Sequence, residues 1–69
     1  MNSNLAHEIG THAGVVYRYL HSEPETTPAA IKRSTGLTQR QIDLALGWLA
    51  REAKVAAITN GRTVRYSVI

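Results

Sequence analysis

The stretch from residue 27 to residue 55 constrains this chain most, because one helix must end and another begin within a few residues there. Thr27 followed by Pro28 predicts a helix start, since threonine is a good N-cap and proline suits the first helical position. Gly36 predicts the end of that helix, because glycine readily adopts the left-handed conformation that closes a helix C-terminus. We therefore predict a short helix over about 28–35, followed by a tight turn.

A longer helix is expected directly after that turn, over about 39–53. Thr38 and Gln41 have the spacing of a capping box, in which each side chain bonds the backbone N–H of the other residue. Five apolar residues share one face of this helix, which we expect to be buried: Ile42, Ala45, Leu46, Leu49 and Ala53. The residues expected on or near the opposite face are Arg40, Asp43, Leu44, Gly47, Trp48 and Arg51.

The N-terminal part of the chain predicts an amphipathic helix over about 3–21. Its apolar stripe consists of Leu5, Ile9, Ala13, Val16 and Leu20, which recur at helical spacing. Gly10 and Gly14 interrupt this helix, and each costs about 1 kcal/mol relative to alanine. Close approach of another backbone would offset that cost, either from a second subunit or, as we favour, from a neighbouring helix of the same chain.

The C-terminal part changes to the pattern of a β-hairpin, with strands expected over about 55–59 and 62–68. Asn60-Gly61 is the strongest two-residue turn signal, because a type I′ turn needs positive φ at both central positions. If Thr59 faces Arg62, four residues share the core face in two pairs: Ala57 with Val64 and Val55 with Tyr66. Residues 25–27 are also expected to pair briefly as a strand.

Three helices followed by a hairpin predict a mainly α winged helix-turn-helix fold, with the hairpin as the wing and residues 1–69 as a single domain. The run Ser34-Thr35-Gly36-Leu37-Thr38, followed by Ile42, Leu46, Leu49 and Val55, resembles the winged helix-turn-helix pattern of many transcription regulators. A closer resemblance is to a family of small stand-alone winged helix-turn-helix domains from bacteria and archaea, whose biochemical role is unassigned. It rests on Ile9-Gly10, Ala13-Gly14, Val16-Tyr17, Tyr19-Leu20, Gly36-Leu37 and Gly47-Trp48-Leu49-Ala50-Arg51-Glu52. That resemblance implies the fold but no catalytic or base-reading residue.

Size and composition favour a small cytoplasmic protein. A chain of 69 residues has one small core and is marginally stable alone, so pairing as a homodimer would help it. There is no cysteine, which excludes a disulfide framework and a thiolate metal site. No apolar run approaches the length of a signal peptide core or a membrane span.

Charge is distributed unevenly along the chain. Residues 1–31 hold one arginine against three glutamates, a net charge of −2, whereas residues 32–69 hold seven lysines and arginines against two acidic residues, a net charge of +5. Such a basic half suits a polyanionic partner such as double-stranded DNA. The alternative is a solvated basic face without a partner.

Enzymatic and metal-binding functions find little support in these residues. His7 and His12 superficially resemble a zinc protease motif, but that motif needs histidines four apart. His7 and His12 are five positions apart, which separates them by about 140° around a helix, so His12 is expected to be a packed or rim histidine. We find no glycine-rich phosphate loop and no serine at a nucleophile elbow. We therefore predict a non-enzyme with no metal, cofactor or small-molecule ligand.

Two functions remain, a DNA-binding module and a protein-interaction or dimerisation module that keeps the fold without DNA binding. For DNA, glutamine and arginine match base edges in the major groove, and other basic residues contact phosphates. The predicted DNA-binding residues are Lys32, Arg33, Thr38, Gln39, Arg40, Gln41, Asp43, Arg62 and Arg65. For the interaction module, Leu44 and Trp48 would form an apolar patch, unless Trp48 folds back as the rim of the core. The predicted dimer or partner contacts are Gly10, Gly14, Leu44, Gly47 and Trp48.

Overall fold

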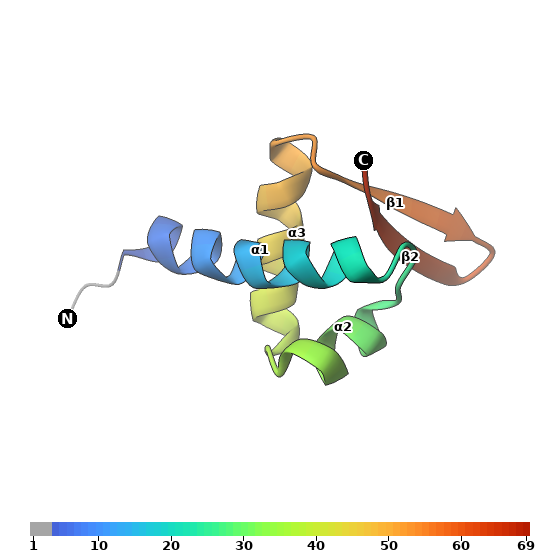
Figure 1. The fold of residues 1–69 in the computed structure, drawn as a ribbon, viewed down its shortest axis with the longest axis horizontal. Helices are drawn as coiled ribbons and strands as arrows, with labels where there is room; N and C mark the ends of the chain where they lie inside the picture. Colours follow the sequence, from blue (N-terminus) through green and yellow to red (C-terminus); the bar gives the residue numbers. More distant parts are fainter. Residues whose placement is uncertain (1–3) are drawn as a thin grey trace.

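The computed structural model describes residues 4–69, which form three helices followed by an antiparallel two-stranded hairpin (Figure 1). The elements are α1 (Leu5–Ser22), α2 (Pro28–Thr35), α3 (Gln39–Arg51), β1 (Val55–Asn60) and β2 (Thr63–Val68). In Figure 1, α1 crosses in front of α3, and its N-terminal turns extend beyond that crossing. The element order and the terminal hairpin confirm the winged helix-turn-helix fold predicted from the sequence.

The helices begin and end at residues that satisfy free backbone groups locally. Thr27 caps α2, with its Oγ1 accepting from the Ala30 N–H at 3.2 Å. Gly36 closes that helix at φ 74°, as predicted. Asn4 caps α1 by accepting from the His7 N–H at 3.0 Å, a cap that the sequence analysis did not identify. The predicted start of this helix at Ser3 lies outside the described residues.

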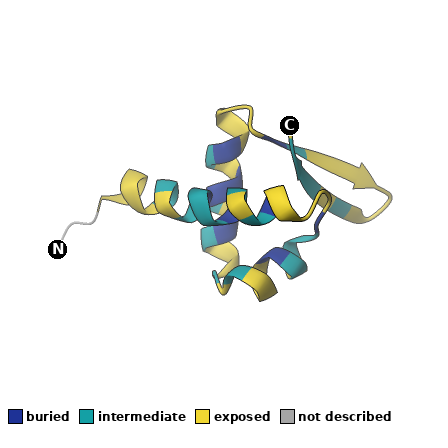
Figure 2. Ribbon diagram, in the orientation of Figure 1, coloured by how far each residue is buried: buried dark blue, intermediate teal, exposed yellow. Residues whose placement is uncertain are grey.

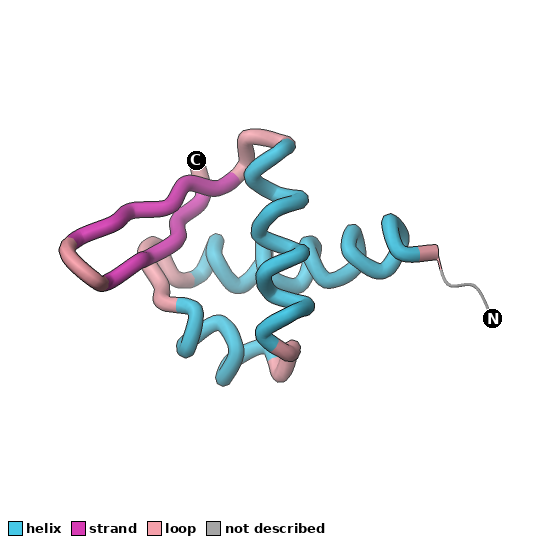
Figure 3. Tube along the Cα trace, turned by 180° about the vertical axis from the view of Figure 1, so that it is seen from behind, coloured by secondary structure: helices cyan, strands magenta, loops and turns pink. Residues whose placement is uncertain are grey.

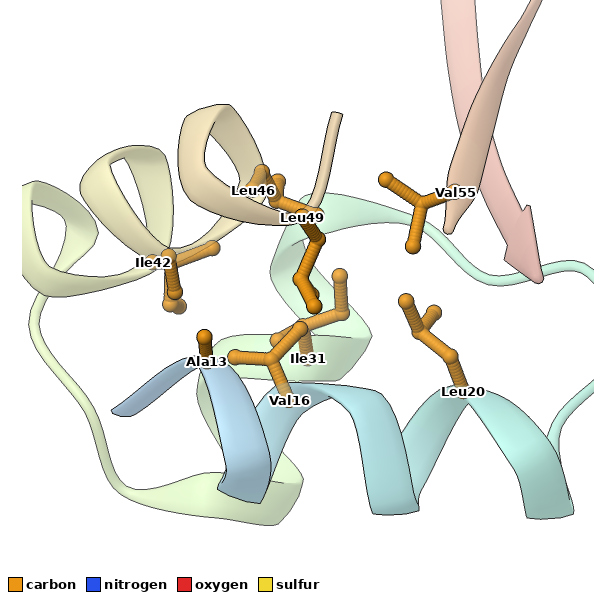
Figure 4. Close-up of a cluster of buried hydrophobic side chains, with 9 residues drawn as sticks. Ala13, Val16, Leu20, Ile31, Ile42, Leu46, Leu49 and Val55 are labelled. Carbon is orange, nitrogen blue, oxygen red and sulfur yellow. The ribbon is translucent and has the colours of Figure 1, made fainter. Parts of the chain in front are cut away.

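Nine buried side chains form the core, and they come from all three helices and β1 (Figures 2 and 4). They are Ala13, Val16, Leu20, Ile31, Ile42, Ala45, Leu46, Leu49 and Val55. In Figure 4, the labelled side chains of α1 and α3 point toward one another across the helix crossing. This confirms most of the two apolar stripes predicted for the first and third helices.

Three residues of those stripes lie outside the buried core, namely Leu5, Ala53 and the half-buried Ile9. Leu5 is 49% exposed, because the first turns of α1 extend past α3 and leave its side chain without a cover. Ala53 is exposed because α3 ends at Arg51, two residues before the predicted boundary at residue 53. The prediction that Leu5 and Ala53 belong to the core was therefore wrong.

Helix α3 ends in a Schellman motif with alanine in the left-handed position. The Ala53 N–H donates to the Ala50 carbonyl at 3.0 Å, the Lys54 N–H donates to the Leu49 carbonyl at 2.9 Å, and Ala53 has φ 57°. A β-carbon in this conformation costs about 1–2 kcal/mol. The motif therefore stops the helix at an energetic cost that glycine would avoid.

Replacing Ala53 by glycine should raise the free energy of unfolding by about 0.5–1 kcal/mol, which is the relief of the left-handed strain less the greater flexibility of unfolded glycine. Urea melts followed by circular dichroism measure the difference. Ala50→Gly is the matched control, because the same change at an exposed helical position of α3 should instead destabilise by about 0.5–1 kcal/mol. A destabilised Ala53→Gly variant would contradict this account of the helix end.

The hairpin register differs from the prediction by two residues. Thr59 lies opposite Val64, Ala57 opposite Tyr66 and Val55 opposite Val68, and the turn is Gly61-Arg62 rather than Asn60-Gly61. Gly61 has φ 65°, which fits a two-residue turn with glycine at its first central position. A shift of two residues leaves every side chain on its predicted face. Val55 is accordingly buried, and Tyr66 and Val68 pack against the core, whereas Ala57, which was predicted on the core face, is exposed because it lies beyond the part of β1 that the core covers.

A short third strand was also predicted, and Thr26 provides it as a single bridge to β2. Its N–H and carbonyl exchange hydrogen bonds with Tyr66 at 3.0 and 2.8 Å. The buried Thr26 hydroxyl lies 3.3 Å from the Tyr19 hydroxyl of α1. The bridge therefore ties the wing to the connection between α1 and α2.

The glycines of α1 do not face a neighbouring backbone within residues 4–69. A Cβ built at Gly10 would lie 4.0 Å from Cζ2 of Trp48, and one at Gly14 would lie 3.9 Å from Nη1 of Arg18, both ordinary side-chain contacts. The favoured explanation, close approach of an internal helix backbone, was therefore wrong.

None of the helices in residues 4–69 combines the length and apolar character needed to cross a bilayer.

Candidate nucleic-acid interface

Helix α3 presents an exposed stripe on the side opposite its buried residues. The stripe consists of Gln39, Arg40, Asp43, Gly47, Ala50 and Arg51, which we call the α3 outer stripe. Figure 3, seen from behind, shows α3 passing in front of α1, with α2 and the hairpin beside it. The centre of the stripe is open, because Gly47 has no side chain and a Cβ built there would meet no atom of residues 4–69 within 4 Å. A flat, solvent-facing helix flanked by two other elements is a surface that a nucleic-acid groove could receive.

The first turn of α3 is organised by hydrogen bonds among its own polar side chains. Oγ1 of Thr38 accepts from the Gln41 N–H at 3.1 Å, and Oε1 of Gln41 accepts from the Thr38 N–H at 2.9 Å, which confirms the predicted capping box. Nε2 of Gln39 donates to Oδ1 of Asp43 at 2.8 Å. Gln41 is half-buried, whereas Gln39, Arg40 and Asp43 are exposed. Three of the predicted base-reading residues thus face solvent, and Gln41 is engaged in the cap.

Leu44 and Trp48 lie along the flank of α3 next to α1. Both are half-buried, and Trp48 packs against the core cluster with its ring near Gly10 of α1. This is the rim position that the sequence analysis left open for Trp48. The patch of two exposed apolar residues on the outer face is therefore absent from the described structure, and Leu44 remains as the apolar edge of the outer stripe.

The predicted phosphate-contacting residues outside α3 are exposed on α2 and the hairpin. Lys32 and Arg33 lie in the last turn of α2, Arg62 lies in the hairpin turn, and Arg65 lies on β2 opposite Ile58. The one ion pair among the described residues joins Lys54 to Glu52 at 3.7 Å. The arginines of residues 4–69 are therefore not neutralised by intramolecular ion pairs.

Arg51 is a residue of this surface that the predicted DNA-binding set omitted. It lies on the same stripe as Arg40 and Gly47, eleven and four residues further along the helix, and it is exposed. Eleven residues make close to three turns of an α-helix, so the two arginines share a face. The periodicity of the sequence already placed Arg51 on or near this face of the helix, but the DNA-binding prediction did not include it.

A groove of about 250 Å³ lies between the first turns of α1 and the start of α3. We call it the α1–α3 groove. Its lining comes from two helices that are separated in sequence, and His12, predicted as a rim histidine, lies half-buried within it. The lining residues are Leu5, Glu8, Ile9, His12, Arg40, Gln41 and Leu44. The groove is thus an amphipathic surface next to the α3 outer stripe.

Residues 4–69 contain no cluster of potential metal ligands. No three histidine, aspartate or glutamate side chains of this part of the chain come together around a point where an ion could sit. The polar side chains of α3 instead pair with one another or face solvent.

The sequence matches the model of one protein family. The model of the family described as winged helix-turn-helix domain (DUF2582) matches residues 1–66. No curated protein matches the chain.

Solved structures share the fold at low sequence identity. One is the Zalpha domain from Carassius auratus PKZ in complex with Z-DNA, with a TM-score of 0.76, 15% identity, and coverage of 88% of this chain and 97% of that one. Another is a structure of HOP2 described for its DNA recognition and protein interaction domains, with a TM-score of 0.69, 24% identity, and coverage of 84% and 98%. At these identities the likeness concerns the fold alone.

Proposed function

This chain belongs to the winged helix-turn-helix family that matches it, and we propose that it binds double-stranded DNA without catalysis, as a transcription regulator. The observation that carries the proposal is the α3 outer stripe, a polar and basic helix face flanked by further exposed cations. Such a helix is the element that enters the major groove in helix-turn-helix proteins.

The residues of the surface divide into three roles. Arg40 is proposed to read a guanine edge, and Asp43 and Gln39, already hydrogen-bonded to each other, to read the neighbouring base pair. Thr38 and Gln41 hold the helix start near the backbone of the duplex. The proposed phosphate contacts are Lys32, Arg33, Arg51, Arg62 and Arg65, which fix orientation without reading sequence.

The structural neighbours support this proposal, because both of those proteins are described for their interaction with DNA. The Zalpha domain was solved in complex with Z-DNA, and the HOP2 study concerns DNA recognition and homologous DNA pairing. The same three-helix and hairpin arrangement therefore serves DNA interaction in other chains, although sequence identities of 15% and 24% transfer no contact residue.

The decisive test is a titration of the protein with duplex DNA at several salt concentrations, following every backbone amide by NMR. Shifts are expected in residues 32–44, at Arg51 and around the hairpin turn. Affinity should fall with salt at a log–log slope of about −0.9 for each phosphate neutralised. The DNA proposal is wrong if residues 32–44 do not shift at low salt.

A second candidate is a protein-interaction module that keeps the fold without binding DNA. The observation favouring it is the α1–α3 groove, whose apolar residues Leu5, Ile9 and Leu44 meet charged residues at its edges.

With either function, we propose that the chain acts in the cytoplasm as a homodimer, since pairing would add buried apolar surface to a small core.

A further inference from the structure

The α1–α3 groove contains apolar surface that the rest of the described chain leaves uncovered. Leu5 is 49% exposed although it belongs to the apolar stripe of α1, and Ile9 and Leu44 are only half-buried. The cause is visible in Figure 1, where the first turns of α1 extend beyond its crossing with α3. An exposed leucine next to further apolar residues in a groove is typical of a surface that contacts another protein.

The groove also has charges of opposite sign on its two sides. Glu8 comes from α1 and Arg40 comes from α3, and both are exposed and line the groove. Among the described residues, neither is in an ion pair. Each charge is therefore available to a partner that presents the opposite charge at the matching place.

We propose that the α1–α3 groove is the interface of a twofold dimer, in which Leu5 and Ile9 of each copy pack into the groove of the other. The charges determine the direction of the axis. A twofold axis running along the groove places Glu8 against Arg40 of the partner subunit on both sides. An axis running across the groove would place like charges together. A second copy of this chain thus complements the groove in both its apolar residues and its charges.

This inference deepens the homodimer proposed above and does not depend on DNA binding. The dimer covers the flank of α3 that faces the first turns of α1, while Asp43, Gly47 and Arg51 lie further along the outer stripe. Arg40 belongs to both surfaces, so the experiment has to separate dimerisation from DNA binding.

Sedimentation equilibrium of the full chain from micromolar to millimolar concentration, without DNA, tests the proposal. Glu8→Arg and Arg40→Glu should each weaken the dimer about tenfold, because every altered ion pair occurs twice in a twofold dimer. The double variant Glu8→Arg/Arg40→Glu exchanges the charges and should restore the dimer to within about threefold of the native chain. Leu5→Lys should weaken it by at least about thirtyfold, because two lysines would enter the apolar contact.

Controls keep each outcome decisive. Arg18→Glu makes a charge reversal on an exposed position of α1 outside the groove and should leave the dimer unchanged. Circular dichroism verifies the fold of every variant, and the exposure of Leu5, Glu8 and Arg40 makes unfolding unexpected. A native chain that stays monomeric at millimolar concentration overturns the proposal, and so does a double variant no stronger than the single ones. DNA titration of the double variant reports separately: loss of DNA binding with a restored dimer assigns Arg40 to both roles.

Discussion

Replacement of Leu49 by alanine is expected to cost about 2–5 kcal/mol of unfolding free energy. Leu49 is 3% exposed and is the last of the four α3 residues in the core, where it faces the side chains of α1 (Figure 4). Removing three carbons there leaves a cavity that two crossing helices close only in part. Because a domain of this size has a total stability near the low end of about 5–15 kcal/mol, the variant is expected to be largely unfolded at 37 °C.

Urea and thermal melts followed by circular dichroism measure this effect. Leu5→Ala is the matched control, because the same chemical change at a 49% exposed position of α1 should cost less than about 1 kcal/mol. The melts are made at low protein concentration, so that dimerisation does not contribute. Equal losses at Leu49 and Leu5 would show that the assignment of the buried face is mistaken.

Reversal of charge at Arg40 is expected to reduce affinity for duplex DNA by about 10- to 100-fold at moderate salt. An arginine that contacts a guanine contributes about 1–3 kcal/mol, and the new glutamate repels the phosphates. Arg40 is exposed in the first turn of α3 and forms no intramolecular ion pair among the described residues, so its loss from the folded protein should be well tolerated. Fluorescence anisotropy with a labelled duplex measures the change.

Arg18→Glu supplies the comparison, because it alters the net charge of the chain by the same amount from an exposed position on α1. Non-specific attraction to the duplex should fall equally in both variants, so the difference between them isolates the contact made by α3. Arg40→Glu in an otherwise monomeric background, such as Leu5→Lys, separates a lost DNA contact from a lost dimer. Equal affinities of the Arg40 and Arg18 variants for DNA would contradict the role of α3.

Local backbone signals in the sequence specified the ends of most elements. Thr27, Gly36 and Thr38 act through hydrogen bonds and backbone conformations that involve residues at most four positions apart, so their effect depends little on the rest of the fold. The exception is Ala53, whose left-handed conformation is unfavourable for alanine. No pattern in the sequence marks it, and the tertiary packing of Leu49 and Val55 on either side fixes where the chain turns.

Candidate site residues were predictable where the function of a residue depends on its place on one helix. The periodicity of α3 correctly placed Arg40, Asp43 and Gly47 on its exposed side. It also placed Arg51 there, although the DNA-binding prediction left that residue out. It did not find the α1–α3 groove, because the two halves of the groove lie about thirty residues apart in sequence. Only the crossing of α1 over α3 brings Glu8 and Arg40 to opposite sides of one surface.

The sequence by itself determined the element order, the capping of α2 and α3 and the alternation of faces in the hairpin, since each follows from interactions between near neighbours. Only the tertiary structure decided which members of the apolar stripes are buried. Leu5 and Leu20 belong to one stripe, yet Leu20 is fully covered and Leu5 is not, because α3 crosses only part of α1. The hairpin register was likewise decided by tertiary contacts, because the backbone of Tyr66 exchanges hydrogen bonds with Thr26 while Val68 lies opposite the buried Val55. Burial and register depend on what a residue packs against, and that partner is brought near by the fold rather than by position in the chain.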